Sequence, residues 1–321
     1  MVAIPIFFTL EKISEKQPFM LSIKKFAAID IGSNAVRLLI SNIIEEKGKP
    51  VRFKKNSLVR VPIRLGGDVF VKGRISNHNI QRMVDTMKAF NLLMRSHNVV
   101  KYKACATSAV REAINGKEVV DIILKESNIK IDIIDGEVEA AIIAATDLHT
   151  FIDVTKTYLY VDVGGGSTEF TIYNLGKVVR SRSFKIGTVR LLNDMVDSNT
   201  WKELEGWIKA NVEDYEKIYI IGSGGNINKI FKMSGKKLGS PLSYFYLSNL
   251  YEKLQSYSYE ERITELDLNQ DRADVIIPAT RIFLSAMKWS GAKSIYVPKI
   301  GLSDGIIKSL YYEKVSSKTL A

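Results

Sequence analysis

The regular part of the chain opens with two apolar stretches separated by a small polar turn. The first stretch covers residues 26–30 of "FAAIDIGSNAVRLLISNI" and breaks at Gly32, and the second covers residues 36–43. Apolar runs of this length around a turn of glycine and small polar residues are typical of two paired β-strands. Strand-like residues continue through "VRFKKNSLVRVPIRLGG". The pattern therefore predicts a strand hairpin and then further strand.

Helix and strand patterns alternate after this hairpin. Apolar residues recur at helical spacing in "HNIQRMVDTMKAFNLLMRSH", a segment that Asn77 can cap. A short strand over 102–106 comes next, and it is followed by helices from about Ser108 and Lys117, the strand "IKIDII" and a helix over about 137–148. Strands that alternate with helices in this way predict an α/β fold.

The second half of the chain repeats the opening pattern. Both "AIDIGSNAVRLLI" and "YVDVGGGSTEFTI" read as apolar strand, aspartate, glycine turn and second strand, so Asp162 matches Asp30. Later segments predict a helix, a strand, a glycine turn and a helix within "WKELEGWIKANVEDYEKIYIIGSGGNINKIF", then a helix within 273–289, the strand "SIYVP" and a helix from Leu302. Such a repeat predicts two similar domains that face each other across a cleft, each adding a glycine turn to it.

The amino-acid composition limits the cellular compartment and the classes of binding partner that we expect for this protein. The single cysteine, Cys105, leaves no disulfide framework or cysteine-rich metal site, as in a reducing cytosol, and we expect it to be a buried small residue. No apolar run approaches the ~18 residues of a membrane span, which predicts a cytoplasmic protein with no membrane partner. The 46 Lys and Arg against 35 Asp and Glu give a net charge of +11, which attracts polyanions such as nucleic acid, anionic lipid or phosphate chains.

Three glycine turns stand behind apolar strands, at residues 30–34, 162–168 and 222–226. Glycine lets backbone N–H groups approach an anion closely, and successive N–H groups form a positive nest. The G-x-x-x-x-G-K-[ST] and G-x-G-x-x-G motifs do not match, so the turns predict phosphate binding of another type, with a simple tight turn as the alternative for each one alone. The expected phosphate-binding residues in these turns are Gly32, Ser33, Asn34, Gly164, Gly165, Gly166, Ser167, Thr168, Gly222, Ser223 and Gly224.

Two carboxylates, Asp162 and Glu169, flank the second glycine turn, where they would repel a bound phosphate. A Mg²⁺ ion between them and the phosphate explains this pattern, because Mg²⁺ prefers oxygen ligands and keeps much of its hydration. The alternative is that Asp162 caps the turn and Glu169 is a solvated strand residue. We expect Asp162, Glu169 and the matching Asp30 to hold Mg²⁺, with Mn²⁺ as another possible ion.

The chain resembles the exopolyphosphatase and guanosine pentaphosphate phosphohydrolase (Ppx/GppA) phosphatases. The matching segments, in family order from about residue 26 to 306, are "AAIDIGSNAVRLLI", "ATSAVREAIN", "IIDGEVEA", "VDVGGGSTEF", "SFKIGTVRL", "GSGG", "RADVIIPA" and "GLSDG". Of these, "DIGSN" and "GGGST" point only to the wider actin, Hsp70 and sugar kinase superfamily, whereas "ATSAVREA", "DGEVEA" and "RADVIIPA" are specific to this family. The resemblance implies two ribonuclease H-like domains with a cleft between them. It also implies Mg²⁺-dependent hydrolysis of terminal phosphates from inorganic polyphosphate, or of the 5′ γ-phosphate of pppGpp.

This pattern also sets the expected domain organisation. We expect a disordered extension over 1–20, a first domain over 21–142 and a second over 143–303, with a last helix at about 304–321 that could pack back on the first. The extension lacks a basic start and a cleavage site, so it does not read as a targeting peptide, and Met20 would serve as well as Met1 as the true start. Longer relatives append a His-Asp phosphohydrolase domain, and the absence of an adjacent His-Asp pair predicts the short form.

The resemblance places the family's general-base glutamate at Glu139, just before an alanine in "DGEVEA". Val138 stands where the family has a second glutamate, Asp135 where it has serine, and Ser303 where it has arginine. The changes at Val138 and Asp135 could alter the hydrogen bonds that support the base. The change at Ser303 removes one basic contact. The alternative role for Glu139 is a charge that stabilises the N-terminus of its helix.

Several basic residues near the matched segments are candidates for phosphate contacts. Arg37 follows the first turn, and Arg111 lies on a short helix whose N-terminus favours an anion. A polyphosphate chain is neutralised by Lys and Arg much as a nucleic-acid backbone is, so further cations could line a channel. The alternative for each of them is a solvated surface charge. The candidate channel residues are Arg64, Lys185 and Arg190.

The leading prediction is an exopolyphosphatase, a phosphoanhydride hydrolase that acts on inorganic polyphosphate, with guanosine pentaphosphate (pppGpp) as the alternative substrate. A kinase of the same superfamily would need an adenosine pocket around "GSGGN" and an acceptor pocket, whereas "DGEVEA" favours activation of water. A sensor that binds polyphosphate or alarmone without hydrolysis is a further alternative, because of Val138 and Ser303. No specific nucleic acid partner is expected, and a homodimer is one possible assembly.

Overall fold

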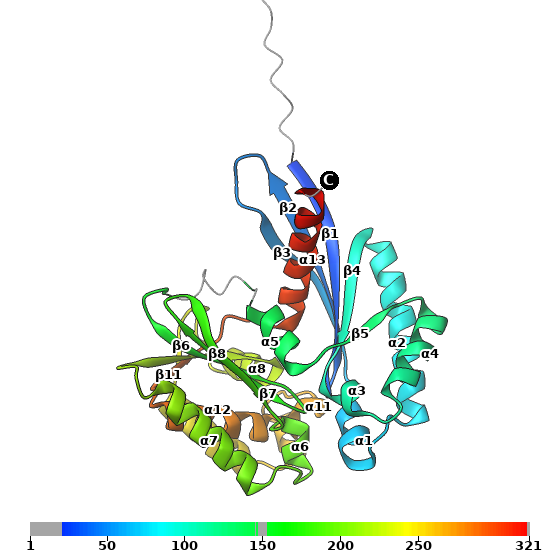
Figure 1. Cartoon of the computed structure of the whole chain (residues 1–321). Helices are drawn as coiled ribbons and strands as arrows, with labels where there is room; N and C mark the ends of the chain where they lie inside the picture. The colour runs from blue at the N-terminus through cyan, green and yellow to red at the C-terminus, as the bar shows by residue number, and fades with distance from the viewer. Residues whose placement is uncertain (1–20, 145, 147–152, 320–321) are drawn as a thin grey trace, which may run out of the picture.

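Asp30 and Asp162 are the penultimate residues of equivalent strands in two separate sheets of the computed structural model, which describes residues 21–144, 146 and 153–319. In each sheet, three successive strands pair antiparallel, and the first of them also pairs parallel with a strand that follows two helices. The predicted duplication is therefore confirmed, with two α/β lobes of ribonuclease H-like plan (Figure 1). The extension predicted over residues 1–20 lies outside the described residues.

The N-terminal lobe is built on a five-stranded sheet in the order β3-β2-β1-β4-β5. Helices α2 and α4 pack against each other and bury Met83, Met87 and Phe90 with the apolar face of β1 and β2. The strands of this lobe are β1 (Leu21–Ile31), β2 (Val36–Glu46), β3 (Arg52–Val61), β4 (Val99–Ala106) and β5 (Ile131–Ile133). Its helices are α1 (Leu65–Lys72), α2 (Asn77–Ser96), α3 (Ser108–Glu112), α4 (Gly116–Ser127) and α5 (Gly136–Ala144).

The C-terminal lobe is built on a six-stranded sheet in the order β10-β11-β9-β6-β7-β8. A large apolar core lies between this sheet and helices α7, α8, α9 and α12. The strands are β6 (Thr157–Val163), β7 (Thr168–Asn174), β8 (Lys177–Phe184), β9 (Ile218–Ser223), β10 (Leu242–Ser243) and β11 (Ser294–Tyr296). The helices are α6 (Thr188–Leu192), α7 (Ser198–Val212), α8 (Gly225–Met233), α9 (Tyr244–Ser256), α10 (Tyr259–Thr264), α11 (Gln270–Ala273) and α12 (Ile276–Ser290).

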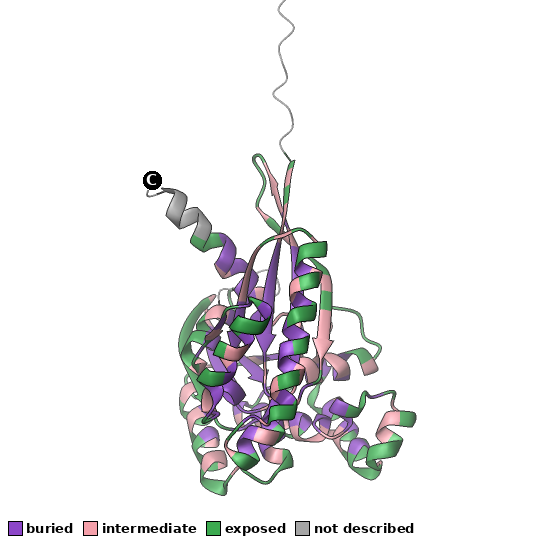
Figure 2. Ribbon diagram, turned by 90° about the vertical axis from the view of Figure 1, so that its right-hand side faces the viewer, coloured by how far each residue is buried: buried purple, intermediate pink, exposed green. Residues whose placement is uncertain are grey.

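The last helix, α13 (Leu302–Thr319), returns to the N-terminal lobe and packs against β1, β2, β4 and α5. It lies on the face of the first sheet opposite α2 and α4 (Figure 1). Ile306 and Leu310 share a buried apolar cluster with Phe26 of β1 and with strands of the second sheet. A side chain at Gly305 would overlap the carbonyl oxygen of Ile142, so glycine is what allows α13 to approach α5 this closely. Strands buried on both faces therefore lie between helices with exposed outer faces (Figure 2).

Two predicted elements need correction. The strand-like reading ran to residue 67, but residues 65–67 begin the helix α1, because Leu65, Val69 and Phe70 lie on one buried face at helical spacing. Asn77 does not cap α2; Ser76 does, and its hydroxyl accepts a hydrogen bond of 3.3 Å from the N–H of Asn79. The helix predicted over 137–148 is α5, and most residues after Ala144 in that range lie outside the described part.

Cys105 is fully buried and unpaired in β4, as predicted, and burial raises the pKa of its thiol to about 12. A thiol in this state is inert at neutral pH, since the thiolate is the reactive form. No helix within the described residues is long and apolar enough to cross a membrane.

Candidate active site

A cleft of about 330 Å³ lies between the lobes where the glycine turns meet. It brings together the three turns, the candidate base and the candidate metal ligands, which are widely separated in sequence. The predicted site residues in its lining are Asp30, Gly32, Ser33, Asn34, Arg37, Glu139, Asp162, Gly164, Gly165, Ser167, Glu169, Ser223 and Gly224. The structure therefore assembles most of the predicted residues into one site.

The first glycine turn joins β1 to β2 and is held by its own side chains. Ser33 Oγ shares a 2.9 Å hydrogen bond with Ser108 Oγ at the start of α3. Asn34 Nδ2 donates to the backbone oxygen of Asp271 in the other lobe at 3.0 Å. The side chains thus fix the position of the turn, and the glycine leaves its backbone open to an anion in the cleft.

The second and third turns use glycine for two different purposes. Gly164 and Gly165 line the cleft, but Gly166 does not, and a side chain at Gly166 would overlap Ser108 and the ring of Phe70 in the other lobe. Gly222 is likewise away from the lining, and a side chain there would overlap Ile295. Close packing therefore requires glycine at both positions, and neither lies in the cleft lining where a phosphate contact was predicted.

Of the two hydroxyl residues Thr168 and Ser223, both predicted to bind phosphate, only Ser223 lines the cleft. Thr168 is fully buried outside the lining, and its hydroxyl donates to the backbone oxygen of Ile186 at 2.5 Å, so it is a structural residue. Ser223 lines the cleft and donates to the backbone oxygen of Ile300 at 2.9 Å. The next residue, Gly224, has a φ of 110°, a conformation that favours glycine, and it is the N-cap residue of α8.

Five carboxylates lie in the cleft lining, and three of them, Glu139, Asp162 and Glu169, repel one another in a buried setting. Burial raises the pKa of Glu139 well above its usual value, and the charges of Glu169 and Asp162 raise it further, while Arg111 opposes the shift. Burial, and then the charge of Glu169, raises the pKa of Asp162 to about 7. Burial also raises the pKa of Glu169, although its Oε1 accepts hydrogen bonds from Ser167 at 2.7 Å and Ser183 at 2.9 Å.

The other two cleft carboxylates, Asp30 and Asp304, are each paired with a cation, and Asp304 lies 2.9 Å from Lys55 Nζ. Arg37 Nη1 lies 2.8 Å from Asp30 Oδ2, on the facing strands β1 and β2. This pairing argues against Asp30 as a direct metal ligand, which the sequence pattern had suggested. It also means that Arg37 enters the cleft as half of an ion pair, so its charge is shared between Asp30 and any bound anion.

The remaining carboxylates suit a hydrated divalent cation better than a closed metal cage. Within the described ranges, no three His, Cys, Asp or Glu side chains come close enough to form a complete ligand set. Mg²⁺ needs only one or two carboxylates, since water and substrate phosphates fill its other positions. Asp162 and Glu169 face each other across β6 and β7 and raise each other's cost of ionisation, a cost that a cation would remove. The donor set therefore fits Mg²⁺ or Mn²⁺ at these two residues.

In the described part of the chain, Glu139 differs from the other cleft carboxylates by having a fully buried oxygen without a partner. Its Oε2 is buried and has no hydrogen-bond partner among the described residues. A buried carboxylate oxygen without a partner is costly unless water, a cation or a substrate group fills the place. Asp135 Oδ1 accepts from the N–H of Val138 at 2.8 Å at the start of α5, which anchors the helix that carries Glu139.

The three residues that depart from the family pattern, Asp135, Val138 and Ser303, have different surroundings in the structure. Asp135 makes the helix-capping bond that serine also makes, so this change preserves the local structure. Val138 is exposed and does not line the cleft, whereas Ser303 does line it. Only the change at Ser303 therefore alters the cleft itself, by leaving out a cation.

Two arginines in the lining were not predicted. Arg60 ion-pairs with Asp271, and Arg272 donates to the backbone oxygen of Gly225. Burial, and then the nearby charges of Arg60 and Arg37, lowers the pKa of Arg272 to about 10. The three guanidinium groups therefore concentrate positive charge in this part of the cleft. Arg272 belongs to "RADVIIPA", which was the available signal, whereas Arg60 lies in an ordinary-looking strand.

The predicted channel residues are not in the lining of the cleft. Arg190 is buried, bonds to Glu112 at 2.5 Å and to the Gly166 carbonyl at 2.7 Å, and stacks 4.0 Å above the ring of Phe70. Arg64 ion-pairs with Asp274, and Lys185 is exposed. Arg190 and Arg64 are thus committed to contacts between the lobes, which corrects their assignment to a channel. The lysines in the lining are Lys55 and Lys299.

Arg111 also lies outside the lining, where its Nη1 donates to the backbone oxygen of Ile134 at 2.7 Å. Its charge nevertheless favours ionisation of both Glu139 and Glu169. Arg111 therefore acts on the carboxylates and not as the phosphate contact that was predicted.

Comparison with known proteins gives one consistent result. A sequence model described as the Ppx/GppA phosphatase family matches residues 57–313. The chain is 30% identical to a bifunctional 3-dehydroquinate synthase/phosphatase of Fusobacterium nucleatum over 84% of its own length, but spans only 44% of that longer protein. It is 23% identical to a putative exopolyphosphatase of Haemophilus influenzae, covering 90% of this chain and 92% of that one. The crystal structure of an exopolyphosphatase from Cytophaga hutchinsonii superposes with a TM-score of 0.79 at 25% identity, covering 90% of this chain and 98% of that one.

Proposed function

The chain belongs to the Ppx/GppA phosphatase family, and we propose that it is a metal-dependent phosphoanhydride hydrolase that releases terminal orthophosphate from inorganic polyphosphate. The observation that carries this proposal is the free Oε2 of Glu139 in a cleft lined by glycine turns from both lobes. Glycine nests hold phosphoryl oxygens, and a buried carboxylate with one unused oxygen can hold the attacking water. Such a pairing supports hydrolysis better than it supports binding alone.

The chemistry follows from the placement of these groups. The turns hold the terminal phosphoryl group, and Arg37, Arg60 and Arg272 balance the negative charge of the chain. Glu139 orients a water molecule and accepts its proton while the new P–O bond forms and the bridging P–O bond breaks. The raised pKa of Glu139 makes its carboxylate a stronger base, and the charge of Arg111 favours the ionised form that must start the reaction.

A bound Mg²⁺ or Mn²⁺ would neutralise the phosphate oxygens and the acidic pair together. Asp162 and Glu169 are the residues that would hold it. Ser167 and Ser183 fix Oε1 of Glu169, so this side chain is oriented before an ion arrives.

Inorganic polyphosphate is the preferred substrate in this proposal because cations continue from the cleft toward its rim. Lys55 and Lys299 line the cleft in addition to the three arginines, and both are exposed, although Lys55 shares its charge with Asp304 at 2.9 Å. A repeating anion can use each of these charges in turn, whereas a compact substrate uses fewer. The cytoplasm is the compartment we propose for this reaction.

Guanosine pentaphosphate is the second candidate, and one observation favours it. Leu58, Ile300 and Leu302 line the cleft beside Asn226 and Asn228, which together could receive a purine ring and its polar edge. The test is phosphate release from long-chain polyphosphate, pppGpp and ATP, measured side by side with Mg²⁺ and again with a chelator. We expect polyphosphate to turn over fastest, and only with the metal. Faster release from pppGpp would reassign the substrate, and tight binding without release from any of them would identify a sensor.

A further inference from the structure

A short segment of the C-terminal lobe, residues 271–275, docks directly on the N-terminal lobe. Val275 is fully buried and belongs to the apolar cluster of the N-terminal lobe, together with Leu65 and Phe70 of α1. Residues 271–274 precede it at the end of α11 and carry two carboxylates and one arginine. The segment is therefore placed to control how the two lobes meet.

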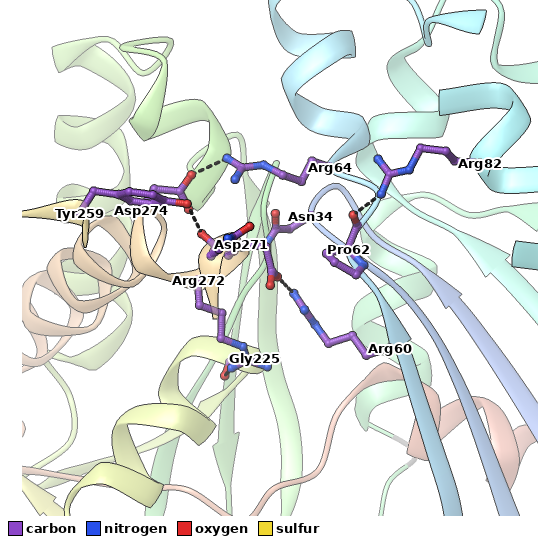
Figure 3. Close-up of polar contacts among 11 residues, drawn as sticks. Asn34, Arg60, Pro62, Arg64, Arg82, Gly225, Tyr259, Asp271, Arg272 and Asp274 are labelled. Carbon is purple, nitrogen blue, oxygen red and sulfur yellow. Dashed lines mark hydrogen bonds and ion pairs between the residues drawn. The ribbon is translucent and has the colours of Figure 1, made fainter. Parts of the chain in front are cut away.

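Both carboxylates of this segment hold arginines of the N-terminal lobe (Figure 3). Asp271 pairs with Arg60, and Asp274 pairs with Arg64. The side chains of the two aspartates are only 9% and 16% exposed, so these pairs are screened by solvent less than ordinary surface pairs are. The two partners are 211 residues apart in the sequence in the first pair and 210 residues apart in the second.

The segment that carries Arg64 is hydrogen-bonded to the first glycine turn. The N–H of Arg64 donates to the backbone oxygen of Asn34 at 3.0 Å, and the N–H of Gly66 donates to that of Ser33 at 2.8 Å. Arg64 has a φ of 62°, an uncommon left-handed conformation that turns the chain into α1. A change in the position of Arg64 should therefore also move the turn, because two backbone hydrogen bonds connect them.

The two ion pairs differ in their access to substrate. Arg60 lines the cleft and could contact a phosphate itself, whereas neither Arg64 nor Asp274 is in the lining. Any effect of the Arg64–Asp274 pair on the reaction must therefore pass through other residues. The first turn is the group that it can reach.

We propose that Arg64 and Asp274 are a positioning pair that sets the first glycine turn, residues 32–34, against the carboxylates of the opposite lobe. This role rests on the proposed hydrolase function, because the phosphoryl group must touch turns from both lobes at once. Misplacement of such a group by about 1 Å can cost as much as 100-fold in rate, while binding by the remaining contacts persists. Loss of the pair should therefore lower kcat more than it raises KM.

The test uses Asp274→Asn, which keeps the shape of the side chain and removes its charge. We expect kcat to fall about tenfold with KM changed less than about threefold. The exchanged pair Arg64→Asp with Asp274→Arg should recover most of the rate, since aspartate tolerates the left-handed backbone at position 64. Glu203→Gln is the matched control, because it breaks an exposed Arg182–Glu203 pair within one lobe and should leave kcat unchanged.

Hydrogen–deuterium exchange gives a readout that needs no substrate. The amides of Arg64 and Gly66 should exchange faster in Asp274→Asn than in the wild type and return toward the wild-type rate in the exchanged pair. An unchanged kcat or unchanged exchange in Asp274→Asn would overturn the proposal, as would an exchanged pair that recovers neither. If no substrate is hydrolysed by the wild type, the hydrolase function fails while the exchange experiment still decides whether the pair holds the turn.

Discussion

Ser183 Oγ donates a 2.9 Å hydrogen bond to Glu169 Oε1. The same serine packs against Gly136 at the start of α5, where any side chain on the glycine would lie within 3 Å of the serine Cβ and Oγ. Since α5 carries Glu139, one residue of β8 connects a proposed metal ligand with the helix of the proposed base. The two acidic groups are thus held at a fixed relative position by a residue outside the glycine turns.

The first prediction concerns Glu139→Gln, which keeps the size of the side chain but removes the base. General-base help is worth about 10²–10⁴ in rate, so turnover of polyphosphate should fall at least about 100-fold. Affinity should stay near the wild-type value, because the turns and arginines remain. The measurements are initial rates of phosphate release and equilibrium binding of the same polyphosphate.

Glu137→Gln is the matched control for this change. Glu137 is exposed on the same helix two residues earlier, and its variant should keep the wild-type rate. A Glu139→Gln protein that retains more than about a tenth of the wild-type turnover would rule out the base.

The second prediction concerns the metal. Asp162→Asn and Glu169→Gln should each raise the Mg²⁺ concentration needed for half-maximal activity by about tenfold or more, because each removes one anionic oxygen ligand. Both variants should still fold, since each replacement is isosteric and relieves charge repulsion in the cleft. The measurements are a metal titration and a thermal melt of each variant, with Asp214→Asn, an exposed site, as the control. Wild-type metal dependence in both variants would remove these residues from the ion site.

The third prediction is a loss of stability of the metal-free protein as the pH rises from about 4 to about 7. The pKa of Asp162 is about 7 in the folded protein, so the folded state keeps a proton that the unfolded state has already released. A raised folded pKa stabilises the protein at low pH, and that contribution disappears as the pH passes the folded value. The free energy of unfolding should therefore fall by up to about 1.4 kcal/mol per pH unit for this carboxylate.

Urea denaturation between pH 5 and pH 8 in the presence of a chelator measures this slope. Asp162→Asn should give a flatter pH profile than the wild type, because asparagine does not titrate. Added Mg²⁺ should stabilise the wild type more at pH 8 than at pH 5, since it binds the ionised carboxylates. Identical slopes in the two proteins would show that Asp162 ionises normally.

The fourth prediction compares two glycines. Gly166→Ala should destabilise the protein by about 1–3 kcal/mol, because the new methyl group overlaps Ser108 and Phe70 across the lobe interface. Gly206→Ala should stabilise it by up to about 1 kcal/mol, since Gly206 is inside α7 with no neighbour near its added methyl group. Denaturant midpoints of both variants test the difference, and equal shifts would show that Gly166 is not a packing residue.

The fifth prediction concerns the salt dependence of polyphosphate binding. The logarithm of the affinity should fall with the logarithm of salt concentration, and less steeply for a trimer than for a long chain. Arg272→Gln should reduce the slope for the long chain by roughly 0.7–0.9, because one phosphate contact is lost. Arg180→Gln, on the exposed strand β8, should leave the slope unchanged. Equal slopes for trimer and long chain would remove the row of cations from the proposal.

The sequence was sufficient where function depends on residues that are neighbours in the chain. Asp162, Glu169 and the two cleft-lining glycines between them belong to one hairpin, at the end of β6, in the turn and at the start of β7, so the repeat of the hairpin pattern located them. The sequence could not show which residues of the other lobe confine each glycine, which are Ser33 at Gly165 and both Phe70 and Ser108 at Gly166. Contacts across the lobes leave no local pattern in the chain.

The charged residues show the same limit. Arg190 looked like a channel residue, but it is buried and its half-buried partner, Glu112, is 78 positions away. Arg60 looked like part of an ordinary strand, and only its contact with Asp271, 211 positions away, marks it as a residue at the junction of the lobes. The periodicity of a sequence predicts which face of a helix or strand a side chain lies on. It does not predict which charged residue of a distant segment will pack against that face.

The position of α13 has a consequence for biosynthesis. This helix is made after the whole second lobe, yet it covers Phe26 and Leu39 in the first sheet and packs on α5 beneath Glu139. A ribosome-bound chain that has both sheets but not this helix therefore exposes an apolar face, which invites chaperone binding or aggregation. Such a chain keeps the contacts of α5 with β7 and β8 but lacks those with α13, so we expect Glu139 to be misplaced and the growing chain to stay inactive until its final helix has emerged. Premature termination within that helix should give an inactive product even though every residue of the cleft's glycine turns has been translated.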